Sequence, residues 1–115
     1  RFWREPRLGD VVFYRAPGEK GEGGNQVGRI VGVPGESIKR MGPTMSVGGR
    51  EPLAIGFEIG PQAKIKDGDT VPEGKYLILV DEDTYEYGDS RQYGYIPQEN
   101  IEYRLAMNLA GTWDK

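Results

Sequence analysis

Residues 75–81, Lys-Tyr-Leu-Ile-Leu-Val-Asp, give the strongest strand signal in the chain. The centre of this stretch is apolar at every position, whereas a strand with one solvated face alternates apolar and polar residues. The turn-forming sequence Val-Pro-Glu-Gly, residues 71–74, comes directly before it. We therefore predict a strand over 75–81 that is buried on both faces.

Shorter strand-like runs lie on both sides of this stretch, and Pro and Gly residues separate them. Residues 18–25 are a glycine-rich hairpin loop without the spacing of a phosphate-binding motif. Residues 82–94 are acidic, tyrosine-rich and loop-like, and no long amphipathic helix is evident. The fold class indicated is all-β: a compact, coiled antiparallel sheet or barrel with little helix. Further strands are predicted over 9–15, 26–33, 36–41, 44–48 and 100–107.

The composition bounds the function. The 115 residues fit a single domain over 1–115, and the net charge of −3 without a basic block argues against nucleic-acid binding. Cysteine and histidine are both absent, which excludes disulfides, thiolate or imidazole metal sites and a Ser-His-Asp triad. We expect neither a cofactor nor a metal. The chain begins at Arg1 without an initiator Met, so it can be part of a longer protein.

An acidic cluster comprises Asp81, Glu82, Asp83 and Glu86. These residues lack the spacing of a calcium-binding loop, so we interpret them as part of a solvated loop and not as a metal site.

Four segments carry more specific information because of their order. They are Gly-Asp-Val-Val-Phe at 9–13, Gly-Arg-Ile-Val-Gly-Val-Pro-Gly-Glu at 28–36, Val-Pro-Glu-Gly-Lys-Tyr at 71–76, and Asp-Ser-Arg at 89–91 followed by Tyr-Gly-Tyr-Ile-Pro. In this order they resemble the type I signal peptidase family, serine endopeptidases that remove signal peptides outside the cytoplasmic membrane. The resemblance implies a core of coiled antiparallel sheets, in agreement with the strand pattern.

Departures from the family pattern fall on its catalytic residues. The family uses a Ser nucleophile and a Lys general base, and this Lys directly precedes the Arg that corresponds to Arg29. Gly28 stands there instead, and glycine has no group that accepts a proton. Residues 1–8 contain neither Ser nor Thr, so the Ser segment is either cut off or lost, and we expect neither it nor the membrane anchor within this chain. We predict no catalytic residue and no activity for the chain as given.

The last motif is altered too. Its alignment places Glu82 within the former Gly-Asp-Asn run and Tyr87 on the Ser beside the catalytic Lys. Asp89 and Arg91 keep their acidic and basic character, and the resemblance implies an ion pair between them. We hypothesise that the Tyr87 ring fills the space above Gly28; a loop tyrosine in solvent is the alternative. The residues assigned to the surroundings of the former active site are Arg29, Glu82, Tyr87, Asp89, Ser90 and Arg91.

Other candidates have simpler interpretations. Lys39 could replace the missing base, but we interpret it as an exposed strand lysine. Ser46 could be a nucleophile, but its position does not match the family's Ser segment. A group of tyrosines forms either a binding surface or packing over the end of the barrel. These are Tyr85, Tyr87, Tyr93 and Tyr95.

Three functions remain open. The first is a non-catalytic domain on the extracytoplasmic face of a bacterial membrane, held there by an N-terminal anchor. It would bind an extended peptide or a secreted or pilus protein along the strand Asn25, Gln26, Val27 and Gly28, and so assist export or surface assembly. The second is the catalytic-core fragment of a signal peptidase, and the third is a structural β domain. Gly28 favours the first function. Trimming of a chain can remove an N-terminal Ser segment, but it cannot change an internal residue from Lys to Gly.

Overall fold

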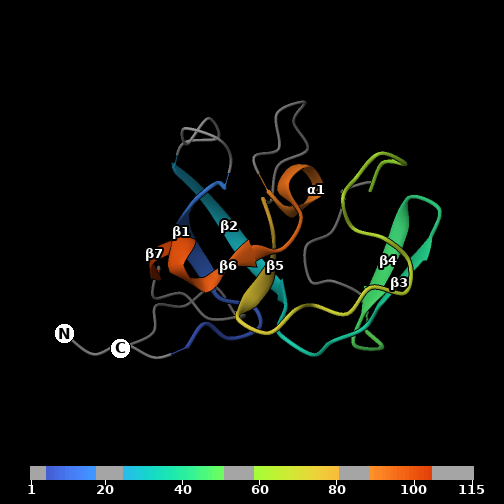
Figure 1. The fold of residues 1–115 in the computed structure, drawn as a ribbon, viewed down its shortest axis with the longest axis horizontal. Coiled ribbons are helices and arrows are strands. Elements are labelled where there is room, and N and C mark those ends of the chain that lie inside the picture. The colour runs from blue at the N-terminus through green and yellow to red at the C-terminus, as the bar shows by residue number, and fades with distance from the viewer. Residues whose placement is uncertain (1–4, 18–24, 51–58, 81–88, 105–115) are drawn as a thin grey trace.

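The fold is known from a computed structural model that describes residues 5–17, 25–50, 59–80 and 89–104. Within these residues, a five-stranded sheet has the order β6-β5-β2-β1-β7, and β3 and β4 form a separate two-stranded sheet (Figure 1). Every pairing is antiparallel. The strands are β1 (Val11–Arg15), β2 (Asn25–Gly32), β3 (Ile38–Met41), β4 (Thr44–Val47), β5 (Lys75–Leu79), β6 (Ile96–Pro97) and β7 (Ile101–Arg104).

Strand β5 lies at the centre of the packing. Tyr76 and Ile78 belong to a cluster on one face of the sheet, which also contains Val12, Tyr14 and Ile30. The alternate residues of β5 join a second cluster, which includes Val31 and Val47. These alternate residues are Leu77 and Leu79. The prediction of a strand buried on both faces is therefore confirmed for the described part of 75–81.

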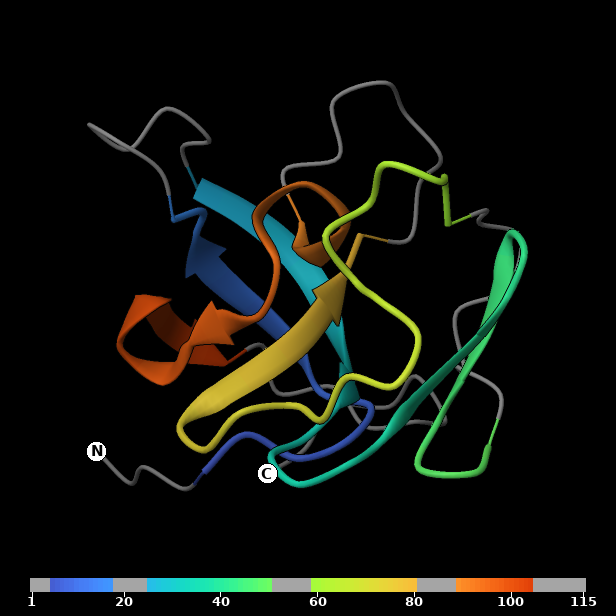
Figure 2. The ribbon, with the colours of Figure 1, turned by 45° about the vertical axis from the view of Figure 1, so that its right-hand side comes forward.

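The β3–β4 hairpin stands beside the main sheet, on the side away from β7 (Figure 2). Met45 and Val47 of this hairpin are buried against the second cluster. The Glu36 carboxylate accepts a hydrogen bond from the Val33 N–H at 2.9 Å and pairs with the Arg50 guanidinium. These contacts fix the turn that leads from β2 into the hairpin.

The expectation of an all-β fold with little helix is confirmed, but the prediction of a loop over 82–94 is wrong in part. Residues Ser90–Tyr93 form a helical turn, α1. The Asp89 side chain caps it by accepting from the Arg91 N–H, and Gly94 ends it with a φ of 78°. Four residues are too few to show a helical hydrophobic period, so the sequence pattern gave no sign of this turn.

The remaining strand predictions hold with small shifts of their ends. β7 begins at Ile101 rather than residue 100, because the 3₁₀ turn η2 (Gln98–Asn100) precedes it. Residues 105–107 of that prediction lie outside the described residues.

Replacing Leu77 with Ala tests the central role of β5. Leu77 is fully buried, so we expect the free energy of unfolding to fall by about 2–5 kcal/mol. Urea denaturation followed by circular dichroism measures this change. Met41→Ala is the matched control, because Met41 is 66% exposed and its loss should change the stability by no more than about 0.5 kcal/mol. Similar effects of both variants would contradict the assignment of the core.

Candidate functional site

Gly28 lies in β2 opposite Val12 of β1, and its environment is crowded. A methyl group added to its Cα would lie 2.6 Å from Ile78 Cγ2, 3.1 Å from the Leu79 carbonyl oxygen and 3.2 Å from Tyr14 Cε1. Carbon atoms that are not bonded to each other pack at about 3.5–4.0 Å. Any side chain at position 28 therefore requires Ile78 or Tyr14 to move.

The hypothesis that the Tyr87 ring fills this space concerns a residue outside the described residues, so it stays a prediction. Among the residues that the structure describes, Ile78 and Tyr14 fill the space, and the resemblance pointed to neither. Alternation along β1 places Tyr14 on the same face as Val12, but the contact with Gly28 also needs the pairing of Ile78 with Ile30, which only the structure gives.

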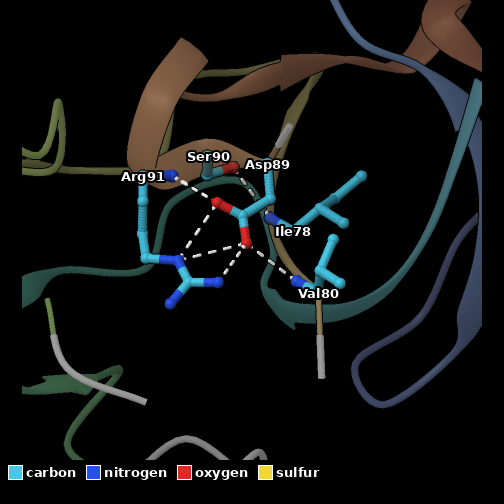
Figure 3. A network of polar contacts seen from close by, with 5 residues as sticks. All are labelled: Ile78, Val80, Asp89, Ser90 and Arg91. Atoms are coloured by element: carbon cyan, nitrogen blue, oxygen red, sulfur yellow. Dashed lines mark hydrogen bonds and ion pairs between the residues drawn. The ribbon is translucent and has the colours of Figure 1, made fainter. Parts of the chain in front are cut away.

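Asp89 and Arg91 form a buried ion pair (Figure 3), as the resemblance implied. Arg91 Nη2 lies 2.8 Å from Asp89 Oδ2, and both side chains are at most 1% exposed. The Asp89 carboxylate also accepts from the backbone N–H of Val80 at 2.8 Å and of Arg91 at 2.9 Å. The buried carboxylate thus has a charged partner and two backbone donors, which offset the cost of removing it from water.

Ser90 connects this ion pair to the residue that faces Gly28. Its Oγ accepts a hydrogen bond from the Ile78 N–H at 2.9 Å (Figure 3). Gly28, Asp89, Ser90 and Arg91 are therefore brought together around Ile78. Arg29 is a neighbour in the chain, but its guanidinium donates to the Gly9 carbonyl at 3.3 Å.

The structure places only part of the predicted surroundings of the site. Because β-strand side chains alternate between faces, that of Arg29 starts from the face of β2 opposite to Gly28. The predicted site residues Glu82 and Tyr87 lie outside the described residues.

Tyr14, which contacts the position of Gly28, is unsuitable as a general base. Burial raises the pKa of its hydroxyl, and the negative charge of Asp89 raises it further. The phenol therefore stays protonated at neutral pH, whereas a general base must present a free lone pair to the proton that it removes.

The predicted peptide-binding strand forms the first half of β2. Asn25 to Arg29 pair with β1, while β5 pairs with β2 only from Arg29 to Gly32. The Ile30 N–H donates to the Asp10 carbonyl and its carbonyl accepts from the Gly9 N–H, both at 2.8 Å. Backbone groups alternate between the two edges of a strand. The backbone N–H and C=O groups of Asn25 and Val27 therefore point to the β5 side, beyond the paired part of β5.

Lys39 and Ser46 face each other across the β3–β4 hairpin. Lys39 is exposed, as the sequence interpretation held. Ser46 is half-buried, and the hairpin that carries both residues forms a sheet separate from the one that contains Gly28. The two residues are therefore not part of the site around Gly28.

The described residues contain neither a metal-binding cluster nor a membrane-spanning helix. Within them, no group of three or more acidic, His or Cys side chains is placed to hold a metal ion. No helix in the same part of the chain has the length and apolar character of a membrane span.

Comparison with known proteins identifies the family. The sequence profile described as "Signal peptidase, peptidase S26" matches residues 2–109. The chain belongs to this signal peptidase family.

Two curated relatives show moderate similarity. "Signal peptidase I V" of Bacillus subtilis (strain 168) is 30% identical, over 80% of this chain and 60% of the relative. "Inactive signal peptidase IA" of Staphylococcus aureus (strain COL) is 29% identical, over 81% of this chain and 54% of the relative. The chain thus spans little more than half the length of either relative.

A solved structure supports the fold. A signal peptidase I from Enterococcus faecalis V583 matches with a TM-score of 0.60 and 23% identity, over 89% of this chain and 97% of the other.

A double-mutant cycle tests the packing at Gly28. We expect Gly28→Ala to lower the free energy of unfolding by about 1–3 kcal/mol, because the added methyl overpacks the site. Ile78→Ala should cost about 2–5 kcal/mol by leaving a cavity. The two losses should sum to more than the loss in the double variant, by at least about 0.5 kcal/mol, because the new methyl enters the vacated space. Chemical denaturation measures all three values.

The control for this cycle is Gly60→Ala. An added methyl at Gly60 meets no atom of the described residues within 4 Å, so it should change the stability little and show no coupling to Ile78→Ala. Additive losses for Gly28→Ala and Ile78→Ala would contradict the contact between them.

Replacing Asp89 with Asn tests the buried ion pair. The substitution leaves the Arg91 charge buried beside a neutral amide, so we expect a loss of about 3–5 kcal/mol in unfolding free energy. Thermal and urea denaturation measure it. Glu36→Gln is the comparison, because the Glu36 and Arg50 side chains are 19% and 34% exposed. Solvent screens that pair, so its loss should cost no more than about 1 kcal/mol. Equal losses would show that burial does not distinguish the two pairs.

Proposed function

We propose that this chain is a non-catalytic signal peptidase-like domain that binds an extended peptide along the Asn25–Gly28 half of β2. The observation that carries the proposal is Gly28, which stands where the family resemblance places the Lys base and has its side-chain space filled by Ile78 and Tyr14. The "Inactive signal peptidase IA" of Staphylococcus aureus offers a precedent among the curated relatives.

The peptide-binding half of the proposal rests on the backbone of β2. The outward-facing N–H and C=O groups of Asn25 and Val27 can pair with an added strand on the β5 side, and such pairing needs no particular side chains. Val27 is 40% exposed, so an added strand would also cover apolar surface. We expect the site to accept small side chains and to bind weakly, since backbone pairing supplies most of the affinity.

The family membership supports a cellular role. We place the domain at the extracytoplasmic face of a bacterial membrane, attached through an N-terminal anchor outside this chain. Its partner would be a secreted or pilus protein presented in extended form, which the domain holds during export or surface assembly.

The alternative is a catalytic-core fragment that cleaves signal peptides from exported proteins. It requires a base other than position 28 among residues that lie near Asp89 and Ser90. Tyr14 is protonated at neutral pH and Lys39 is in solvent on the separate hairpin. The described residues therefore favour the non-catalytic role.

Titration of the ¹⁵N-labelled chain with a capped six-residue peptide of alanine and serine tests both halves of the proposal. We expect amide shifts at residues 25–29, and mass spectrometry should find the peptide intact after prolonged incubation. Val27→Pro should abolish the shifts, because proline removes the N–H that faces the added strand without removing a bond to β1. Val27→Ala keeps that N–H and should retain binding within about threefold.

Two outcomes would overturn the proposal. Equal binding by Val27→Pro and the unmodified chain, or shifts confined to other strands, would exclude pairing at this edge. Peptide cleavage that depends on the purified chain would exclude the non-catalytic role.

A further inference from the structure

A cavity of about 470 Å³ lies at the opposite end of β2 and β5 from Gly28. The segment 5–8 forms one wall, the turns at 33–34 and 73–74 form others, and Tyr76 and Gln98 complete the lining. Residues 33–34 follow the end of β2 and residues 73–74 precede the start of β5. The cavity is therefore separate from the proposed peptide-binding edge, which lies at the other end of β2.

Tyr76 is the buried polar group of this cavity. Its side chain is 4% exposed and its ring packs in the cluster with Ile78 and Ile96. Within the described part of the chain, its hydroxyl neither donates nor accepts a hydrogen bond. The hydroxyl oxygen is not among the fully enclosed polar atoms that lack a partner, so it is accessible from the cavity that Tyr76 lines, where a ligand can donate a hydrogen bond to it.

The charges that line the cavity are Glu5, Arg7 and Glu73. Burial raises the pKa of the Tyr76 hydroxyl, and the negative charges of Glu5 and Glu73 raise it further. The hydroxyl thus stays neutral and lies in the negative potential of two carboxylates. The remaining walls include Pro6, Leu8, Val33 and Pro34, which are apolar.

Apolar walls beside two carboxylates and one guanidinium, with a phenolic hydroxyl accessible from the cavity, match one kind of ligand group. A lysine or arginine side chain has an aliphatic stem that packs on apolar surface and a cationic head that donates hydrogen bonds. We propose that this cavity binds a basic side chain of a polypeptide partner. The stem lies against Val33 and Pro34, and the cationic head donates to the Tyr76 hydroxyl and the Glu73 carboxylate.

This site extends beyond the proposed function and stands independently of it. A partner that binds at both places would carry an extended, small-residue segment for β2 and a basic residue for this cavity. Each place can fail without the other, because the two lie at opposite ends of the sheet and involve different residues.

The test is an NMR titration of the ¹⁵N-labelled chain with three capped tripeptides, Gly-Lys-Gly, Gly-Arg-Gly and Gly-norleucine-Gly. Norleucine has an unbranched alkyl chain like that of lysine but no charge. We expect the lysine or the arginine peptide, or both, to shift the amides of Gly74 and Gln98, with a dissociation constant at least threefold lower than that of the norleucine peptide. The tighter of the two basic peptides identifies the preferred head group.

Four variants locate the binding, each measured with the tighter basic peptide. Glu73 is exposed, so Glu73→Gln should weaken binding only about two- to fivefold, the range for an exposed ion pair. Tyr76→Phe removes only the hydroxyl and should weaken it about two- to tenfold, as the loss of one hydrogen bond predicts. Arg7→Gln removes a positive charge from the rim and should leave binding unchanged or tighter. Glu99→Gln is the matched control, because Glu99 is exposed and does not line the cavity.

Amide spectra of each variant establish that it remains folded before binding is compared. The proposal is overturned if neither basic peptide shifts Gly74 or Gln98, or if the norleucine peptide binds as tightly as the basic peptides. It is also overturned if Glu73→Gln and Tyr76→Phe bind like Glu99→Gln. Shifts at residues 25–29 alone would support the β2 edge and not this cavity.

Discussion

The buried carboxylate of Asp89 is the constraint on which the rest of the candidate site depends. A helix of four residues has too few hydrogen bonds to form by itself, yet α1 has a defined place above β5. Asp89 holds α1 in that place, because its carboxylate pairs with Arg91 of the turn and accepts a hydrogen bond from the Val80 N–H, directly after β5. Ser90 is then positioned to accept from Ile78, and this bond holds the segment of β5 whose side chain faces Gly28. The contacts between α1 and β5 thus fix the position of Ile78, the side chain that packs against Gly28.

The contacts that stabilise this part of the fold do not involve a side chain at position 28. The ion pair, the N-cap and the hydrogen bond at Ser90 stabilise the fold whether or not a base is present. At position 28 the side chain is absent, and Ile78 and Tyr14 occupy the space in front of the backbone. The backbone of Gly28 is densely packed and does not border an open cavity, which agrees with the high packing density of protein interiors.

Much of the fold could be predicted from the sequence, because strand signals are local. The apolar run at 75–81 indicated burial on two faces, and the glycines and prolines marked where the other strands end. The turn α1 could not be predicted, since it depends on one capping carboxylate and on contacts with a distant strand. The ion pair between Asp89 and Arg91 was predicted from the family resemblance and not from a local sequence pattern. The contact of Ile78 and Tyr14 with Gly28 depends on how three strands pack, and no short motif records that.

The packing at Gly28 also bears on how such a domain can evolve. A substitution to lysine at this position would have to place a long side chain against Ile78, and shortening Ile78 beforehand would open a hole in the core. Natural domains have only about 5–15 kcal/mol of net stability, so either intermediate would use a large part of it. Positions 28 and 78 are therefore epistatic: a side chain at position 28 becomes acceptable only together with a smaller residue at position 78, and neither single step is neutral.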